Sequence, residues 1–584
     1  MKVANPRINK LDLIVLFVVC FIFSGTFENV KAQDPIVNSF SPATGPVGTL
    51  VRVSGMNLGG TTAIIIGGVS AILLSNTDTS VVGMVMPYAT TGQVSVTSGG
   101  FTADGSSDFI VTPTSYPNMQ QGSKLVGTGN SGGAWQGSSL SVSADGNTAI
   151  VGGMIDNIGQ GAAWVYTRNG NSWTQQGGKL VGSGNVGSAQ QGISVSVSAD
   201  GNTAILGGIE DNSNQGAAWV FTRSSGVWTQ QGVKLVGTGN IGAARQGVSV
   251  SLSADGNTAI VGGFGDNSGQ GAAWIFIRNS GTWTQQGGKL VGTGNFGRGS
   301  QGYSVALSAD GNTAIVGGFG DSLFRGAAWV YTRTDGIWTQ QGAKLVGSAF
   351  IGSAQQGWSV SLSADGNTAI IGGLGDNSNQ GAAWVFLRNG GNWTQQGAKL
   401  IGTGNIGGAQ LGSAVSLSAD GNTAIAGGNR DNSFQGAAWL FTRSGDSWMQ
   451  EGAKLVGTGS IGSAYQGSSV SISADGNTAL SGGNRDNSLQ GAAWVFISTP
   501  KIYFRSIISG NWNDPNTWES SPFKDFSSGV LSPAAFPPGA TSNGINIRQG
   551  HTVTLSENVS VRQIFVHPDG RLDIIGCNLT ILPG

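Results

Sequence analysis

The sequence predicts an all-β fold whose largest part is a seven-bladed β-propeller. The first observation is a heptapeptide, Ser-Ala-Asp-Gly-Asn-Thr-Ala, that occurs seven times at a constant spacing of 55 residues. The second is that a typical unit contains four short runs of strand-like composition, the first of them alternating apolar residues with Ser. No helical period appears in any unit. Seven equal units of four strands fit a propeller, which usually has four to eight blades.

The phase of the repeats, which span residues 116–499, predicts that the ring closes through an N-terminal strand. The last unit has its third run, 491–496, but no fourth run follows it. The matching segment, 120–127, instead precedes the first heptapeptide. We therefore expect the last blade to take its outer strand from upstream of the first, which leaves no unpaired sheet edge in the ring. An open solenoid would need polar capping units at both ends, and the sequence shows none.

Residues 1–32 have the composition of an export signal. Lys2, Arg7 and Lys10 precede an apolar run over 13–23, and 30–32 offer a small-residue cleavage site. We expect a secreted or cell-surface protein with no membrane span after cleavage. A single anchor helix is the alternative, although the run is short for a span of about 20 residues.

The overall composition excludes some classes of partner. Only 10% of the residues are charged and the net charge is −1, so the chain offers no basic surface for nucleic acid. Removal of residues 1–32 would leave Cys577 as the one thiol, without an internal disulfide. We expect a monomer whose partner is an extracellular protein or a polysaccharide.

Residues 34–113 predict a small β-sandwich, because short alternating runs there are separated by Gly and Pro. The stretch 36–49, Ile-Val-Asn-Ser-Phe-Ser-Pro-Ala-Thr-Gly-Pro-Val-Gly-Thr, resembles the opening of IPT/TIG domains. The resemblance implies an immunoglobulin-like fold. In bacterial surface proteins such domains serve as spacers or adhesive modules; we expect a spacer and assign no site here.

A typical 55-residue unit has a Gly-x-Ser-Val start, a central Asp-Gly and a Gly-Gly that follows. In these motifs the unit resembles FG-GAP repeats, the family of the integrin α-subunit propeller and of many bacterial surface proteins. In that family the first hairpin often holds calcium through the spacing D-x-D-x-D-G-x-x-D. Here Asp145 keeps its place, but the other positions are Ser141, Ser143 and Ala149. Calcium normally takes six to eight oxygens, so we expect no cofactor and expect Asp145 to bond its own turn; a calcium site is the alternative.

A second acidic series follows the second strand of each unit. These seven carboxylates would either form a ring that binds cations or cap their own loops, and we favour the loop caps. The residues of this series, which are weak candidates for metal ligands, are Asp156, Asp211, Asp266, Asp321, Asp376, Asp431 and Asp486. Lys124, Trp164 and their copies recur in the same way, and we expect them to stabilise the blade.

The loops that join the fourth strand to the first, and the second to the third, share one face of a propeller. They also carry most of the differences between copies, and variable loops on a constant scaffold are typical binding sites. Neutral drift among duplicated units is the alternative explanation. Large aromatic and arginine side chains dominate recognition surfaces, and these loops supply Trp135, Arg245, Arg298, Phe324, Arg325, Trp358 and Tyr465 as candidate ligand-binding residues.

Residues 502–584 contain alternating runs separated by Gly, which predict either rungs of a β-solenoid or a small sandwich. The Gly-Asn-Trp opening at 510–512 and Gly-His-Thr-Val at 550–553 resemble the start of a β-solenoid module common in exported bacterial proteins. The pattern stops at Gly584 in mid-run, which predicts a truncated module.

The sequence shows no catalytic constellation. His551 and His567 are the only histidines, and neither lies in the repeats. Glycoside cleavage needs two acids in different environments, whereas nearly every repeat acid is copied in all seven units, with Glu210 as an exception. The leading hypothesis is a non-catalytic exported recognition or adhesion protein that binds a glycan or protein. A carbohydrate-active enzyme or its binding subunit, and a structural spacer of a surface layer, are the alternatives.

Overall fold

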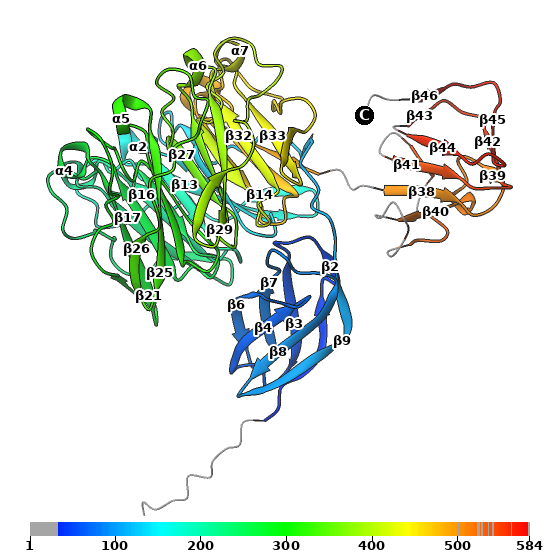
Figure 1. Ribbon diagram of the computed structural model, residues 1–584, viewed down its shortest axis with the longest axis horizontal. Helices are drawn as coiled ribbons and strands as arrows, with labels where there is room; N and C mark the ends of the chain where they lie inside the picture. Colours follow the sequence, from blue (N-terminus) through cyan, green and yellow to red (C-terminus); the bar gives the residue numbers. More distant parts are fainter. Residues whose placement is uncertain are drawn as a thin grey trace, which may run out of the picture.

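The computed structural model describes residues 33–498, 502–521, 526, 530–534, 537–539, 542–561 and 563–581, so the expected export signal lies outside the described residues. The fold is all-β, as predicted. Figure 1 shows three parts: an N-terminal sandwich in blue, the repeat region from cyan to orange, and a C-terminal module in orange and red. No helix in these described ranges has the length and apolar character needed to cross a bilayer.

The N-terminal part is a two-layered sandwich with sheet orders β1-β3-β7-β6 and β2-β9-β8-β4-β5. Side chains alternate between core and solvent along β3, where Val51 and Val53 are fully buried. They pack with Ile64, Val94 and Phe109 from the other sheet. The strands are β1 (Ile36–Ser41), β2 (Thr44–Gly45), β3 (Leu50–Met56), β4 (Thr61–Ile66), β5 (Val69–Ser70), β6 (Ile72–Thr77), β7 (Ser80–Met84), β8 (Gly92–Ser98) and β9 (Phe101–Val111).

The repeat region folds into seven four-stranded antiparallel sheets, numbered here 1 to 7 along the chain. Sheet 1 comprises β11 (Gln136–Val142), β12 (Thr148–Gly153), β13 (Ala162–Asn169) and β14 (Ser172–Gln175), and sheet 2 comprises β15 (Ser194–Val197), β16 (Thr203–Gly208), β17 (Ala217–Ser224) and β18 (Val227–Gln230). Sheet 3 comprises β19 (Ser249–Leu252), β20 (Thr258–Gly263), β21 (Ala272–Asn279) and β22 (Thr282–Gln285), and sheet 4 comprises β23 (Ser304–Leu307), β24 (Thr313–Gly318), β25 (Ala327–Thr334) and β26 (Ile337–Gln340). Sheet 5 comprises β27 (Ser359–Leu362), β28 (Thr368–Gly373), β29 (Ala382–Asn389) and β30 (Asn392–Gln395), and sheet 6 comprises β31 (Ala414–Leu417), β32 (Thr423–Gly428), β33 (Ala437–Ser444) and β34 (Ser447–Gln450).

Sheet 7 contains a strand from far upstream in the chain. Its own three strands are β35 (Ser469–Ile472), β36 (Thr478–Gly483) and β37 (Ala492–Ile497), and the fourth is β10 (Met119–Gln120). Met119 lies opposite Ile497, and Leu125 continues the pairing at Ala493. This is the pairing that the phase of the repeats predicts.

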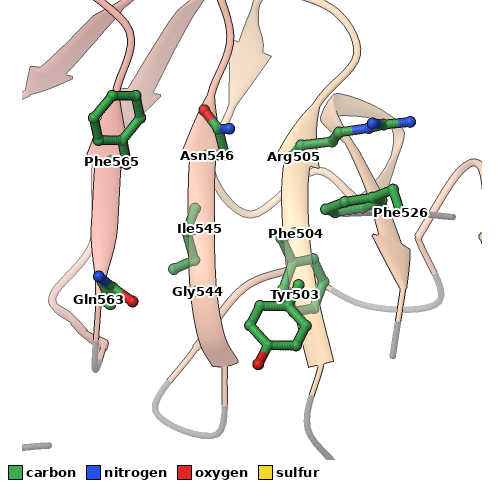
Figure 2. A pocket seen from close by; sticks show the side chains of 9 residues that line it. All are labelled: Tyr503, Phe504, Arg505, Phe526, Gly544, Ile545, Asn546, Gln563 and Phe565. Atoms are coloured by element: carbon green, nitrogen blue, oxygen red, sulfur yellow. The ribbon is translucent and has the colours of Figure 1, made fainter. Parts of the chain in front are cut away.

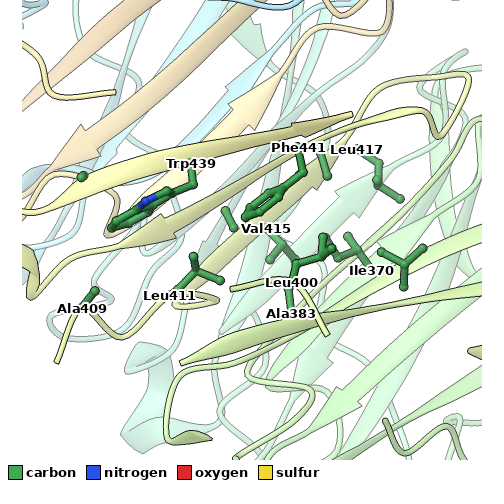
Figure 3. Close-up of a cluster of buried hydrophobic side chains, with 13 residues drawn as sticks. Ile370, Ala383, Leu400, Ala409, Leu411, Val415, Leu417, Trp439 and Phe441 are labelled. Atoms are coloured by element: carbon green, nitrogen blue, oxygen red, sulfur yellow. The ribbon is translucent and has the colours of Figure 1, made fainter. Parts of the chain in front are cut away.

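Each sheet packs against the sheet before it through a buried tryptophan of its third strand. In Figure 3, Trp439 and Phe441 of sheet 6 lie over Ile370 and Ala383 of sheet 5. The indole Nε1 of Trp439 donates to the Thr403 carbonyl at 2.8 Å, so the buried polar atom is satisfied. The equivalent tryptophans are all 0% exposed, as expected of core residues: Trp164, Trp219, Trp274, Trp329, Trp384, Trp439 and Trp494.

Sheets 1 and 7 contact each other in the same way. Trp164 of sheet 1 packs in one cluster with Leu480 and Val495 of sheet 7. The Ser469 hydroxyl donates to the Gly137 carbonyl at 2.8 Å, as the Ser194 hydroxyl does to Gly247 between sheets 2 and 3.

The N-terminal sandwich covers the end of the repeat region at which the heptapeptide turns lie. Six backbone N–H groups bond the next alanine carbonyl in the series at 2.9–3.0 Å, which links Ala144, Ala199, Ala254, Ala309, Ala364, Ala419 and Ala474. Met84 is 2% exposed and packs into the apolar cluster that these alanines form. Thr114 also donates to Asp420 Oδ2 at 2.9 Å.

Most strand pairs of the C-terminal module are parallel, and β38 with β40 is an antiparallel pair. Ile545 of β41 lies between Phe504 of β38 and Ile564 of β44, while β42 pairs with β45 and β43 with β46. Parallel stacking is the arrangement expected of solenoid rungs. The elements are β38 (Ile502–Ser506), β39 (Gly510–Asn511), η1 (Pro515–Thr517), β40 (Trp518–Ser521), β41 (Ser542–Ile547), β42 (Thr552–Leu555), β43 (Val559–Val561), β44 (Ile564–Val566), β45 (Arg571–Ile574) and β46 (Leu579–Ile581).

In six of the seven copies, a buried glutamine side chain forms two hydrogen bonds to the backbone of a glycine that precedes the first strand. In the fourth copy the Gln301 amide is 0% exposed; its Oε1 accepts from the Gly292 N–H at 2.6 Å and its Nε2 donates to the Gly292 carbonyl at 3.0 Å. The sixth copy has Leu411 in this place, beside a cavity of about 320 Å³ that Gly402 and Trp439 also line. The sixth copy therefore lacks a pair of hydrogen bonds that the others make.

We predict that Leu411→Gln stabilises the chain by about 1 kcal/mol, because it restores two buried hydrogen bonds at the expense of one apolar side chain. The reverse change, Gln301→Leu, should destabilise it by about 2 kcal/mol, because it leaves the Gly292 N–H and carbonyl buried without partners. Urea unfolding midpoints of the two variants test this. A lower midpoint for Leu411→Gln would contradict the account of the sixth copy.

Candidate functional site

The loops between second and third strands gather at the end of the sheets opposite the N-terminal sandwich, as α4, α5, α6 and α7 do along the top of Figure 1. Each contains one four-residue turn whose second and third residues have left-handed dihedrals; in the first copy Asn157 has φ 51° and Ile158 has φ 57°. Asn tolerates this conformation well. The turns are α2 (Asp156–Gly159), α3 (Asp211–Asn214), α4 (Asp266–Gly269), α5 (Asp321–Phe324), α6 (Asp376–Asn379), α7 (Asp431–Phe434) and α8 (Asp486–Leu489).

The acidic series that begins these turns is buried in ion pairs. Asp266 Oδ2 bonds Lys289 Nζ at 2.6 Å, and its side chain is 1% exposed. Its Oδ1 accepts the Ile241 backbone N–H at 2.7 Å, which fixes the loop before the first strand of the same sheet. All seven copies repeat this pattern with N–O distances of 2.5–2.6 Å to the lysine. Each carboxylate thus caps its own loops, and no group of three or more metal-binding side chains occurs among the described residues.

The aspartate of each heptapeptide is bonded within its own turn. Asp145 Oδ1 accepts from the Ser143 hydroxyl and the Asn147 N–H, and Oδ2 accepts from the Asn147 amide. This is the Asx-type arrangement of a tight turn.

A cavity of about 690 Å³ opens among the starts of the first strands, at the end where the variable loops lie. All seven sheets contribute to its wall. The contributing positions that differ most from copy to copy are Ser138, Ile193, Val248, Tyr303, Trp358, Ser413 and Ser468. Because the sandwich covers the other end of these strands, the cavity faces solvent on the loop side.

One side of the cavity is aromatic and apolar. Tyr303 of sheet 4 and Trp358 of sheet 5 have ring centroids 4.6 Å apart. Phe319 lies behind both rings, at 4.7 Å from Tyr303 and 5.0 Å from Trp358. Burial raises the pKa of the Tyr303 hydroxyl, so this group stays protonated and neutral at physiological pH.

The other side, on sheets 6 and 7, is polar. Asn429, Arg430, Asn484 and Arg485 line it. The Arg485 guanidinium lies over the ring of Tyr465 at 4.7 Å and over that of Trp135 at 5.3 Å. Arg430 lies over Phe434 at 5.8 Å. Neither guanidinium has a carboxylate partner within 4 Å among the described residues, so aromatic faces position both charges without neutralising them.

The predicted site residues have different positions relative to this cavity. Trp358 and Tyr465 line it, and Trp135 contacts Arg485 at its edge. Arg245 lies over the Phe264 ring at 5.5 Å, and Phe324 stacks on the Phe319 ring at 6.3 Å. Neither Arg245 nor Phe324 lines the cavity.

Arg298 and Arg325 are exposed farther out and are not part of the cavity wall. Tyr303 and Asn429 of the wall were not among the predicted site residues. The signal was present: these residues occupy the variable positions after the Gly of the first strand and after the Gly-Gly of the second.

Seven equivalent residues, three of which (Gln355, Gln410 and Tyr465) line the cavity, adopt the left-handed region, which is uncommon for residues other than glycine. Their φ angles lie between 52° and 60°, and their side chains differ in chemistry. They are Trp135, Gln190, Arg245, Ser300, Gln355, Gln410 and Tyr465. Backbone strain of this kind often accompanies binding sites.

A second cavity, of about 420 Å³, lies on the C-terminal module (Figure 2). Tyr503, Arg505, Phe526 and Phe565 are among its lining residues, and the Arg505 guanidinium lies 4.2 Å from the Phe526 ring centroid. In contrast to Arg430 and Arg485, Arg505 is paired with a carboxylate, that of Glu519.

If the buried aspartates act as ion-pair caps, Asp266→Asn should lower the unfolding midpoint by the same amount in calcium and in EDTA. The loss should be about 3 kcal/mol, because the substitution leaves Lys289 partly buried without its partner. The double variant Asp266→Asn, Lys289→Met should be less destabilised than the sum of the single variants. A calcium-dependent midpoint of the wild-type chain that Asp266→Asn abolishes would favour a cation site instead.

Comparison with known proteins bears on the N-terminal part. Residues 35–111 match the IPT/TIG domain family, and this range coincides with the immunoglobulin-like sandwich. No curated protein matches the chain. The resemblance of the repeats to FG-GAP repeats stays a prediction.

Proposed function

We propose that sheets 1 to 7 form one closed seven-bladed propeller of the FG-GAP type. The pairing of β10 with β37 supports closure, since β10 leads directly into sheet 1. The packing of Trp164 against sheet 7 also supports it, because every other pair of neighbouring sheets meets in this way.

We further propose that the protein is exported and acts at the cell surface as a non-catalytic recognition or adhesion protein, with the cavity and its rim as the binding site. The observation that carries this proposal is the placement of the positions at which the copies differ. Several of them, among them those of Trp358, Asn429 and Tyr465, line one cavity of about 690 Å³, within the range of 300–1,000 Å³ typical of ligand sites. The IPT/TIG domain lies at the far end, where it leaves the cavity mouth accessible and fits the role of a spacer.

The cavity wall favours binding over hydrolysis. Its lining residues include two arginines, several amides and hydroxyls, and no Asp, Glu or His among the described residues. The repeat acids that are not copied in every unit, Glu210, Asp335, Asp446 and Glu451, are not among them either. A glycosidase would need a pair of carboxyl groups at this place.

Closure predicts a cross-link between the two ends of the repeat region. In a Cys577→Ser background, Met119→Cys with Ile497→Cys should form an intramolecular disulfide, because these residues lie opposite each other in β10 and β37. Oxidation should raise the stability by about 2–4 kcal/mol relative to the reduced variant. Non-reducing electrophoresis and urea unfolding measure both effects, and exclusive formation of disulfide-linked dimers would contradict a closed ring.

Recognition predicts a ligand in a screen of the purified chain against a glycan array and a panel of extracellular matrix proteins. The double variant Trp358→Ala, Tyr465→Ala should weaken binding of that ligand at least tenfold while the chain remains folded at the assay temperature, as circular dichroism would show. A matched control is Val227→Ala, Ile337→Ala, because these exposed apolar residues (63% and 67%) start the fourth strands at the opposite end. Absence of any ligand, or equal losses in both variants, would contradict the proposal.

A further inference from the structure

We propose, building on the proposed function, that the cavity binds an acidic saccharide, with a sugar ring against the Tyr303–Trp358 side and its carboxylate or sulfate group against Arg430 and Arg485. The seven sheets contribute unequally to one wall. An evenly repeated wall would present the same chemistry on every side, whereas this wall is apolar on one side and cationic on the other.

The apolar side arises because four successive copies carry large apolar residues at one position. These are Ile193, Val248, Tyr303 and Trp358, in sheets 2 to 5. The Trp358 and Tyr303 rings are held by contacts with Phe319 and with each other, so they present a fixed surface. A fixed aromatic surface suits the apolar face of a sugar ring, since little side-chain entropy is lost on binding.

The cationic side selects an anion. Arg430 and Arg485 both extend from sheets 6 and 7 at equivalent positions, and each is exposed and without an acidic partner among the described residues. A guanidinium binds a carboxylate or sulfate through paired N–H donors. The absence of Asp and Glu from the described lining residues means that no like charge opposes an anionic ligand there.

Uncharged polar groups on the cationic side match a ligand rich in hydroxyls. Asn429 Oδ1 is buried at the wall without a hydrogen-bond partner in the described part of the chain. Its equivalent, Asn484 Oδ1, instead accepts from the Ser468 hydroxyl at 3.3 Å. A buried acceptor without a donor is unfavourable, and a ligand hydroxyl would supply that donor.

Two serine hydroxyls of the wall keep a proton to donate. Ser249 Oγ accepts the Val305 N–H and Ser304 Oγ accepts the Val360 N–H, both at 3.0 Å. Each hydroxyl is therefore oriented by the next sheet, and its own proton is available to a ligand oxygen.

The test is an array of uronate oligosaccharides (oligogalacturonate, oligomannuronate and hyaluronan fragments) and of sulfated ones without uronate (keratan sulfate and carrageenan fragments), each beside its neutral carboxyl-reduced or desulfated form. We expect at least one acidic member to bind at least tenfold more tightly than its neutral match. Comparison of the carboxylated and sulfated sets shows whether a carboxylate or a sulfate group is the anion that binds.

Variants then assign the binding to the cavity. Arg430→Ala with Arg485→Ala should remove the preference for the acidic form, while Trp358→Ala should weaken both forms at least tenfold. The matched control, Arg52→Ala with Arg548→Ala, removes the same charge from exposed residues of the two flanking modules and should change neither affinity.

Two outcomes would overturn the proposal: no acidic member bound more tightly than its neutral match, or an unchanged preference in the double arginine variant. Binding of a neutral glycan or a protein that Trp358→Ala weakens would reject the acidic saccharide alone and leave the recognition function in place. If no ligand class in the screen binds, both the acidic-saccharide proposal and the recognition function are rejected.

Discussion

One buried carboxylate in each repeat fixes the geometry on which the candidate site depends. The aspartate after the second strand, Asp266 in the third copy, binds the lysine that follows the fourth strand and the backbone N–H of the loop that leads to the first strand. Three segments that are distant along the repeat are thereby held at one point. Because the carboxylate is almost fully buried, displacing either partner would expose it to an apolar environment at a high cost in free energy.

This constant framework allows the neighbouring positions to vary. The backbone of the rim is fixed by bonds to Asp and by the buried glutamine, and the side chains at the rim and along the wall contribute little to those bonds. Substitutions such as Val248 in one copy and Trp358 in another therefore change the chemistry of the cavity without changing the sheet beneath. A sevenfold scaffold can in this way carry a site with no sevenfold symmetry.

Much of the fold could be predicted from the sequence because the copies can be aligned with one another. The strand order within each sheet and the N-terminal origin of β10 follow from the spacing and phase of the repeats. The core role of Trp164 and its copies follows from their constancy. The left-handed turns α2 to α8 could not be predicted, because Asp-Asn-Ser is compatible with several loop conformations.

The candidate site was only partly predictable. Trp358 and Tyr465 were selected as large side chains in variable loops, and both line the cavity. Arg298 and Arg325 satisfied the same criterion but lie farther out, because the direction of a side chain from a loop depends on dihedral angles that its composition does not determine. Tyr303 was missed although it occupies the position equivalent to that of Trp358, so applying the same criterion to every copy would have selected it.

The position of the arginines relative to β10 has a consequence for biogenesis. Arg485 belongs to sheet 7, the one sheet whose outer strand is supplied by residues more than 300 positions upstream. A nascent chain therefore cannot complete the cationic side until its last repeat has emerged and recruited that early strand. Until then, an incompletely folded molecule would lack the arginine side of the cavity.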